Sequence, residues 1–141
     1  MYRVFILDDQ PSKVEDIMRV INDCLGKENV EFDNGKFINA GLSMVRKGQY
    51  DLLIIDDTMP RFTDRPNDLE GHIAEEVLYF LELRGSTVPC IVCSSNNDKE
   101  YAESLMKDFK DTLLGYVRYD IASIDWEKDM KRFVREALNV A

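Results

Sequence analysis

The sequence has no apolar run approaching the roughly 18 residues that a membrane-spanning helix requires. Its N-terminus also lacks the charged and then apolar pattern of a secretion signal. We therefore expect a cytoplasmic chain with no membrane partner. The sequence has only three cysteines. An odd number without a secretion signal is typical of reduced thiols rather than of a disulfide framework.

Positive charge is also scarce, with 18 Lys and Arg residues against 27 Asp and Glu and a net charge of -9. Because nucleic-acid phosphates attract basic surfaces, this balance argues against nucleic acid as a partner. It is compatible with a protein partner that has a basic patch. The 141 residues, of which 45% are hydrophobic, are enough for one domain with a proper core, and we expect a single domain over residues 1–141.

Several catalytic signatures are absent. His72 is the only histidine, and there is no G-x-S-x-G serine elbow for it to serve. Neither a dinucleotide-binding glycine motif nor a P-loop occurs. Cys90 and Cys93 have the spacing of a redox or zinc pair, but they fall within a predicted strand, where positions three apart face opposite sides. We interpret both as small core residues.

Two apolar runs, each followed directly by two carboxylates, are the most informative feature of the sequence. Residues 52–55 predict a strand that is buried on both faces, and residues 4–7 predict a second one. The paired acids are Asp56 and Asp57 after the first run and Asp8 and Asp9 after the second.

If these strands are parallel neighbours, their acids meet at one edge of the sheet. Unit charges about 4 Å apart repel by about 4 kcal/mol at an effective dielectric constant near 20. Such a cluster needs protonation or a cation, and ligands that are all oxygen favour Mg2+. The alternative is that the acids form ordinary solvated turns.

Strand and helix patterns alternate along the rest of the chain. Apolar stripes predict helices at residues 11–25, 38–46, 69–84, 98–109 and 126–137, and short strands are predicted at 4–7, 30–32, 52–55, 88–93 and 115–119. Residues 61–68 are expected to be irregular. This alternation predicts an α/β fold, a doubly wound five-stranded parallel sheet with helices on both faces, because right-handed crossovers place helices on each side.

Four motifs in this order resemble the receiver domain of two-component response regulators, over nearly the whole chain. They are Ile-Leu-Asp-Asp-Gln-Pro at 6–11, Asp-Leu-Leu-Ile-Ile-Asp at 51–56 with Met59-Pro60, Pro-Cys-Ile-Val-Cys-Ser at 89–94, and Gly-Tyr-Val at 115–117. The resemblance implies a flavodoxin-like fold and phosphorelay signalling. The chain would receive a phosphoryl group from a histidine kinase or phosphotransfer protein and act on a downstream protein target.

The resemblance also implies roles for individual residues. Asp56 matches the phospho-acceptor. Ser94 matches the hydroxyl residue that moves toward the phosphoryl group, and Tyr116 matches the switch aromatic that rotates inward with it. The implied Mg2+ ligands are Asp8, Asp9, Asp56 and the backbone carbonyl of Thr58.

The sequence departs from the family pattern at two places. The family has a Lys-Pro pair after the fifth strand, and its lysine pairs with the phosphoryl oxygens, but this chain has Tyr119-Asp120. A tyrosine donates one hydrogen bond and brings no positive charge. The segment after Pro60 is also several residues longer than is usual. Tyr119, Arg61 and Arg65 are therefore candidates to compensate for the missing cation, while a solvated loop is the alternative for the arginines.

The resemblance implies no conventional enzyme, only self-phosphorylation and dephosphorylation at Asp56. Because the sequence ends shortly after the last predicted helix, we expect no output domain. The signal would leave through the last strand and its flanking helices, which could also form a homodimer. The alternative is a pseudo-receiver, an interaction module without phosphotransfer, which the missing lysine favours and the intact acids oppose. A Mg2+-dependent phosphatase or transferase is the third possibility, and the lack of a visible general base or basic substrate site argues against it.

Overall fold

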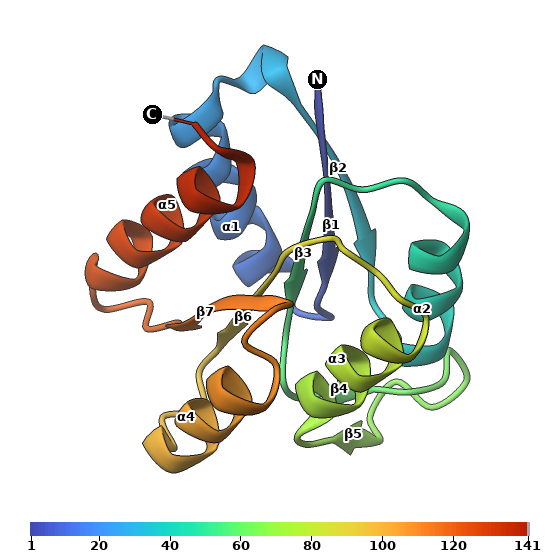
Figure 1. Ribbon diagram of the computed structural model, residues 1–141. Coiled ribbons are helices and arrows are strands. Elements are labelled where there is room, and N and C mark those ends of the chain that lie inside the picture. Colours follow the sequence, from blue (N-terminus) through green and yellow to red (C-terminus); the bar gives the residue numbers. More distant parts are fainter. Residues whose placement is uncertain (141) are drawn as a thin grey trace.

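Five parallel strands form the central sheet of the computed structural model, which describes residues 1–140 (Figure 1). The strands are β1 Tyr2–Leu7, β2 Val30–Gly35, β3 Leu52–Ile55, β6 Cys90–Ser94 and β7 Leu113–Arg118. Their order across the sheet is β2-β1-β3-β6-β7. The doubly wound parallel sheet that the sequence predicts is therefore confirmed, with β1 and β3 as direct neighbours.

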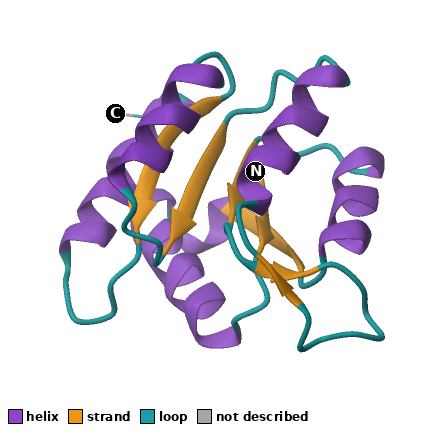
Figure 2. Ribbon diagram, turned by 90° about the horizontal axis from the view of Figure 1, so that it is seen from below, coloured by secondary structure: helices purple, strands orange, loops and turns teal. Residues whose placement is uncertain are grey.

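Five α-helices cover the two faces of this sheet (Figure 2). They are α1 Pro11–Leu25, α2 Ile38–Lys47, α3 Ile73–Leu83, α4 Lys99–Asp108 and α5 Asp125–Leu138, with a short 3-10 turn, η1, at Lys27–Asn29. Buried residues of α1 and α5 share one core cluster, and those of α2, α3 and α4 share the other. Within residues 1–140, no helix is both long enough and apolar enough to cross a membrane.

Both faces of the sheet are apolar, because its central strands are made of consecutive apolar residues and successive residues of a strand point to opposite sides. On β1, Phe5 packs into the cluster of α2, α3 and α4, whereas Ile6 packs into that of α1 and α5. Cys90 and Cys93 on β6 are divided between the two clusters in the same way. Both are free thiols with 0% exposure, which agrees with their interpretation as core residues.

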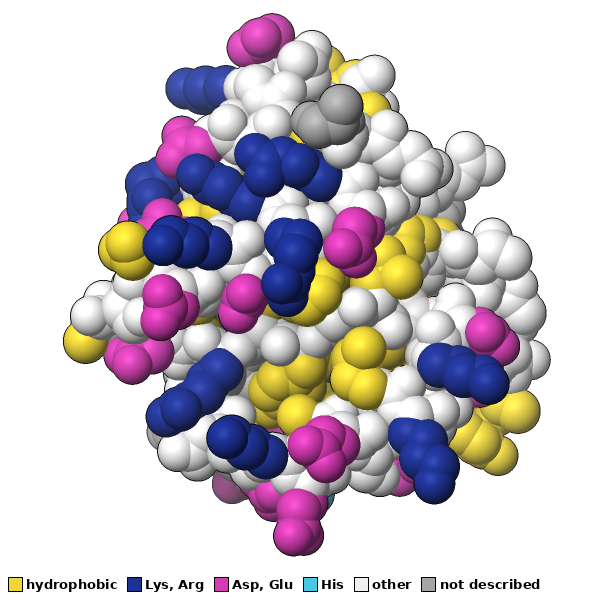
Figure 3. Space-filling model, turned by 60° about the vertical axis from the view of Figure 1, so that its left-hand side comes forward, with side chains coloured by type: hydrophobic (Ala, Val, Ile, Leu, Met, Phe, Trp, Pro, Cys, Tyr) yellow, Lys and Arg dark blue, Asp and Glu magenta, His cyan; other side chains and the backbone are white. Residues whose placement is uncertain are grey.

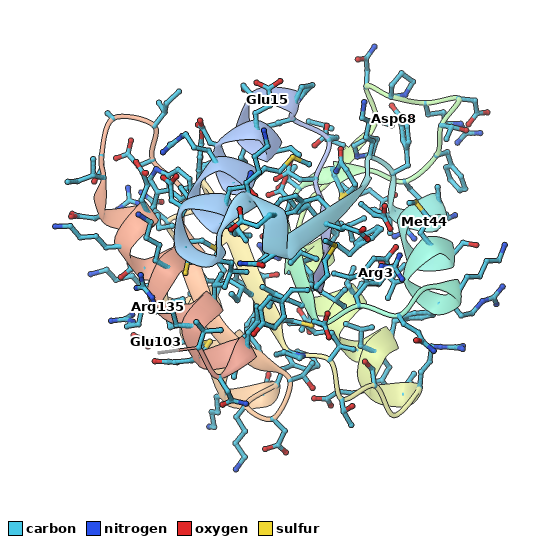
Figure 4. The ribbon with its side chains drawn as sticks, turned by 90° about the horizontal axis from the view of Figure 1, so that it is seen from above. Arg3, Glu15, Met44, Asp68, Glu103 and Arg135 are labelled. Carbon is cyan, nitrogen blue, oxygen red and sulfur yellow. The ribbon has the colours of Figure 1, made fainter. Side chains whose placement is uncertain are left out.

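Helix α1 is placed by its ends and by one apolar face. Pro11 starts it, where the missing amide hydrogen costs nothing, and Gly26 ends it with a φ of 91°. The buried face consists of Lys13, Val14, Ile17, Val20 and Ile21. Lys13 is thus a charged residue on the inner face of the helix, whereas Glu15, two positions later, points away from the molecule (Figure 4).

A short hairpin occupies the long segment between β3 and α3. Its strands, β4 Met59–Pro60 and β5 Leu69–Glu70, pair antiparallel. The prediction that a helix begins at Leu69 is wrong, because Leu69 and Glu70 belong to this hairpin and α3 begins at Ile73. His72 sits before α3 in the left-handed region, with a φ of 56°, so the helical backbone cannot extend back through it.

Candidate functional site

Three carboxylates lie together where β1 and β3 end. Asp8, Asp9 and Asp56 each offer an oxygen atom, and these oxygens lie within 4.8 Å of one another. The parallel register that places Leu7 opposite Ile55 brings the residues that follow both strands to the same edge. Asp8 is 1% exposed and Asp56 is 5% exposed, so the repulsion between these charges is only weakly screened by water.

The donor atoms of this cluster fit a hard divalent cation. Oδ1 of Asp9 is buried and has no hydrogen-bond partner among the described residues. Burial, together with the neighbouring charge of Asp8, raises the pKa of Asp9. A cation held by the three acids would relieve both costs, and an all-oxygen ligand set is the one that Mg2+ prefers. Thr58, whose carbonyl is the fourth implied ligand, lies exposed in the turn after Asp57.

A buried lysine lies between two of the acids. Nζ of Lys13 is 2.9 Å from Oδ2 of Asp8 and 3.0 Å from Oδ1 of Asp56, and it donates a 2.6 Å hydrogen bond to the backbone carbonyl of Cys93. Burial by itself lowers the pKa of Lys13, but the charges of Asp56 and Asp8 outweigh that effect and the pKa is raised. The ammonium group therefore stays charged. Sequence reasoning missed this residue, because a lysine beside the apolar stripe of a helix is usually solvated through its long side chain.

The two oxygens of Asp56 have different surroundings. Oδ1 receives both the Lys13 ammonium, at 3.0 Å, and the backbone amide of Asp57, at 2.8 Å. Oδ2 takes part in neither contact. Burial raises the pKa of Asp56 to about 6, against the opposing effect of the Lys13 charge. The arrangement fixes Oδ1 through two contacts in which Oδ2 takes no part.

Asp57 faces away from this cluster. Its side chain is fully buried and accepts hydrogen bonds from the Tyr101 hydroxyl at 2.6 Å, the Ala74 amide at 3.2 Å and the Asn96 side-chain amide at 3.4 Å. The structure therefore brings together three of the four acids that follow β1 and β3. The fourth connects the end of β3 with α3 and α4.

Ser94 and Tyr116 lie on neighbouring strands and share one contact residue. Ser94 ends β6, and its hydroxyl oxygen accepts a 3.1 Å hydrogen bond from the Asn96 amide. The hydroxyl of Tyr116, on β7, donates to the Asn96 carbonyl at 3.2 Å. Both side chains are thus held by the loop that connects β6 with α4.

Tyr119 lies over Lys13. The Tyr119 ring centroid is 5.6 Å from Nζ of Lys13, and its hydroxyl donates a 2.6 Å hydrogen bond to Asp16 on the same helix as Lys13. The phenol group therefore directs its hydrogen bond to α1.

The two arginines of the long segment have partners of their own. Arg61 binds Glu70 at 2.8 Å and Glu76 at 2.6 Å, and Arg65 lies 5.6 Å from the Phe62 ring. Asp68, which is labelled in Figure 4, shows that this loop lies at the edge of the molecule. Within residues 1–140, Lys13 is the one basic side chain that forms an ion pair with Asp56.

Comparison of the sequence with known proteins gives one clear similarity. No model of a known protein family matches the chain. The chain is similar to the Detocs response regulatory protein DtcB of Enterobacter cloacae (strain JD6301), with 22% identity over an alignment of 149 positions, gaps included, that covers 95% of this chain and 99% of that protein.

Solved structures share the fold. The receiver domain protein (CheY-like) of Methanospirillum hungatei JF-1 superposes with a TM-score of 0.66 at 16% identity, covering 99% of this chain and 94% of that one. The response regulator protein TrrA of Thermotoga maritima, solved in complex with Mg(2+)-BeF, gives 0.66 at 22% identity, covering 98% and 100%. A LuxR-family DNA-binding response regulator of Staphylococcus aureus gives 0.69 at 13% identity, covering 99% and 100%. The resemblance seen in the sequence is therefore confirmed at the level of the fold.

Proposed function

We propose that this chain, which has the receiver fold of response regulators, accepts a phosphoryl group on Asp56 in a phosphorelay. The donor would be a phosphohistidine on a histidine kinase or phosphotransfer protein. The observation that best supports this proposal is the acidic cluster of Asp8, Asp9 and Asp56, in which a buried oxygen of Asp9 has no hydrogen-bond partner within residues 1–140. Such an oxygen is expected where a Mg2+ ion completes the site.

The reaction would proceed as one exchange of bonds at phosphorus. An oxygen of the Asp56 carboxylate would form the new O–P bond while the P–N bond to the imidazole breaks. The imidazole nitrogen would leave with the bonding electrons and take up a proton. A bound Mg2+ would supply positive charge to the phosphoryl oxygens. The Asp57 amide, which holds Oδ1 of Asp56 at 2.8 Å, would orient the nucleophile.

The phosphoryl group would change the local charge enough to shift the loop after β6. It adds roughly 1.5 to 2 negative charges near pH 7. We infer that the Ser94 hydroxyl would donate to a phosphoryl oxygen. Because Ser94 and Tyr116 both contact Asn96, a movement of Ser94 would also change the contact that holds Tyr116.

The face formed by α4, β7 and α5 is the expected output surface. Figure 3 shows Lys and Arg side chains on this face around exposed hydrophobic side chains, with acidic side chains among them. A cavity of about 200 Å³ there is lined by Tyr116, Arg118 and Lys99, among other residues. We infer a downstream protein partner or a second copy of the chain, and a cytoplasmic location.

The test is phosphorylation in vitro. The protein is incubated with Mg2+ and phosphoramidate, and its intact mass is measured, with Asp56→Asn as the matched control. We expect an acid-stable, base-labile adduct with the mass of one phosphoryl group in the native chain, and none in the control. Absence of the adduct with every donor, including a cognate kinase, would contradict the proposal.

A pseudo-receiver is the second candidate. Tyr119 stands where the family has its lysine, and Lys13 already neutralises part of the charge on Asp56. An interaction module of this kind would bind its partner equally well with and without the phosphodonor. A phosphorelay receiver would change its partner affinity on phosphorylation, and this change would be lost in Asp56→Asn.

A further inference from the structure

We propose that Lys13 on α1 is the phosphoryl-binding cation of this chain, in place of a lysine at position 119. This inference rests on the proposed function, because it concerns the phosphoryl group on Asp56. The family lysine follows the last strand, and this chain has Tyr119 there. In this chain an ammonium group reaches the Asp56 carboxylate from the first helix instead, at 3.0 Å.

The contacts of Lys13 favour a functional role over a purely structural one. Its ammonium group has three N–H donors, and its three oxygen neighbours belong to Asp8, Asp56 and the backbone of Cys93. Two of these are acids of the cluster, and the third residue directly precedes Ser94. The ammonium group therefore lies among the residues that would surround a phosphoryl group, within reach of its oxygens once it forms on Asp56.

The position of Tyr119 is consistent with this exchange. Its ring covers Nζ of Lys13 at 5.6 Å, and its hydroxyl donates a hydrogen bond to Asp16 on the same helix. A face of an aromatic ring attracts an ammonium group, most strongly where water is excluded. A lysine at position 119 would instead bring a second positive charge close to Lys13. The chain therefore has a lysine at one of the two positions and an aromatic cover at the other.

The charges in the cluster indicate that Lys13 acts together with a metal ion. Three carboxylates and one ammonium group leave two negative charges, which one divalent cation balances. Oδ1 of Asp9, the unpartnered oxygen, is not used by Lys13. Arg61 and Arg65 are held by Glu70, Glu76 and Phe62, which leaves Lys13 as the cation paired with Asp56 within residues 1–140.

The test removes the lysine at position 13 and places one at position 119, the position that it has in the family. Three variants are compared with the native chain: Lys13→Met, Tyr119→Lys, and the double variant Lys13→Met/Tyr119→Lys. We expect Lys13→Met to reduce the rate of phosphorylation by phosphoramidate or the lifetime of the adduct by about tenfold or more. The double variant, which has its lysine at the family position, is expected to regain most of that loss. A merely structural lysine would not be replaced from position 119.

A second readout does not depend on phosphorylation. The dissociation constant of Mg2+ is measured by titration for the unphosphorylated proteins. Because Lys13→Met removes a positive charge from beside the carboxylates, we expect it to bind Mg2+ several-fold more tightly. The double variant should return toward the native value.

The outcomes separate the two proposals. A native chain that is never phosphorylated contradicts the proposed function. A native chain that is phosphorylated, with an unchanged rate, lifetime and Mg2+ affinity in Lys13→Met, overturns the role of Lys13 alone. Circular dichroism and thermal melting check that each variant folds. If Lys13→Met does not fold, the double variant is compared directly with the native chain. A phosphorylation rate and adduct lifetime close to those of the native chain support the inference, and a folded double variant that is not phosphorylated overturns it.

Discussion

The hydroxyl of Tyr101 on α4 donates a 2.6 Å hydrogen bond to Oδ1 of Asp57, the residue directly after the proposed phospho-acceptor. Asp57 has 0% exposure, and no ion pair holds it among residues 1–140. Its charge is compensated by hydrogen bonds instead, and burial together with Asp57 raises the pKa of Tyr101. Helix α4 is thus hydrogen-bonded to the side chain of the residue that directly follows Asp56.

Replacing Tyr101 with Phe should therefore destabilise the protein. The ring can still stack on His72, whose ring centroid lies 4.2 Å from that of Tyr101 in the native chain. The buried carboxylate of Asp57, however, loses its shortest hydrogen bond. The expected loss is about 1.5 to 3 kcal/mol, typical of a bond to a charged group. Urea denaturation measures it, with Tyr79→Phe, at an exposed tyrosine, as the control. Equal stability of the two variants would mean that this bond contributes little.

The carboxyl group of Asp56 should titrate well above a free aspartate. Burial raises its pKa to about 6, from an ordinary value of 3.8, so the carboxylate needed as nucleophile is lost as the pH falls through about 6. NMR of 13C-labelled carboxyl groups without metal measures the midpoint, and Asp56→Asn identifies the signal. Adding Mg2+ should lower the midpoint, because a bound cation favours the charged form. A metal-free midpoint near 3.8 would contradict this prediction.

Arg61 should stabilise the hairpin without affecting the phosphorylated state. Its guanidinium group joins Glu70 of β5 to Glu76 of α3, and Glu70 has its pKa lowered by this contact. Because the pair is close to solvent and screened, we expect Arg61→Ala to lower the Tm by only a few degrees, less so at high salt. Arg65→Ala is the control and should leave the Tm unchanged. A shortened adduct lifetime in Arg61→Ala would show that this loop reaches the site.

A side chain at position 115 should destabilise the protein. A methyl group at this position on β7 would overlap the ring of Phe133 on α5. We expect Gly115→Ala to cost about 1 to 3 kcal/mol of the free energy of unfolding, as overpacking usually does. Gly71→Ala is the matched control, since an added methyl group there meets no atom within 4 Å. Combining Gly115→Ala with Phe133→Leu should recover part of the loss, and denaturant titration of all three variants tests this.

The sheet and its acidic edge were predictable because their signals are local. Residues 4–7 and 52–55 are apolar throughout, and the acids after them are fixed to the strand ends by the chain itself. The β4–β5 hairpin was not predictable, since two-residue strands show no periodicity. The start of α3 was misplaced because Leu69 continues the apolar stripe of the helix in sequence but pairs with Pro60 in the structure.

Lys13 was not predictable, because its role depends on how α1 lies across the sheet. A lysine beside an apolar stripe is usually solvated through its long side chain. Only the folded position of α1 against the sheet brings Nζ close to Asp8, Asp56 and Cys93. Arg61 and Arg65 were plausible substitutes because of their charge, but the partners of Arg61, Glu70 and Glu76, come from elements whose placement the sequence does not specify.

The sole tryptophan of the chain lies close to this site. Trp126, at the start of α5, is 3% exposed, and its ring centroid lies 4.9 Å from that of Tyr119, which in turn covers Lys13. Indole emission shifts with the electric field and the packing around the ring. The intrinsic fluorescence of the unlabelled protein should therefore report, in real time, when a metal ion or a phosphoryl group arrives at Asp56.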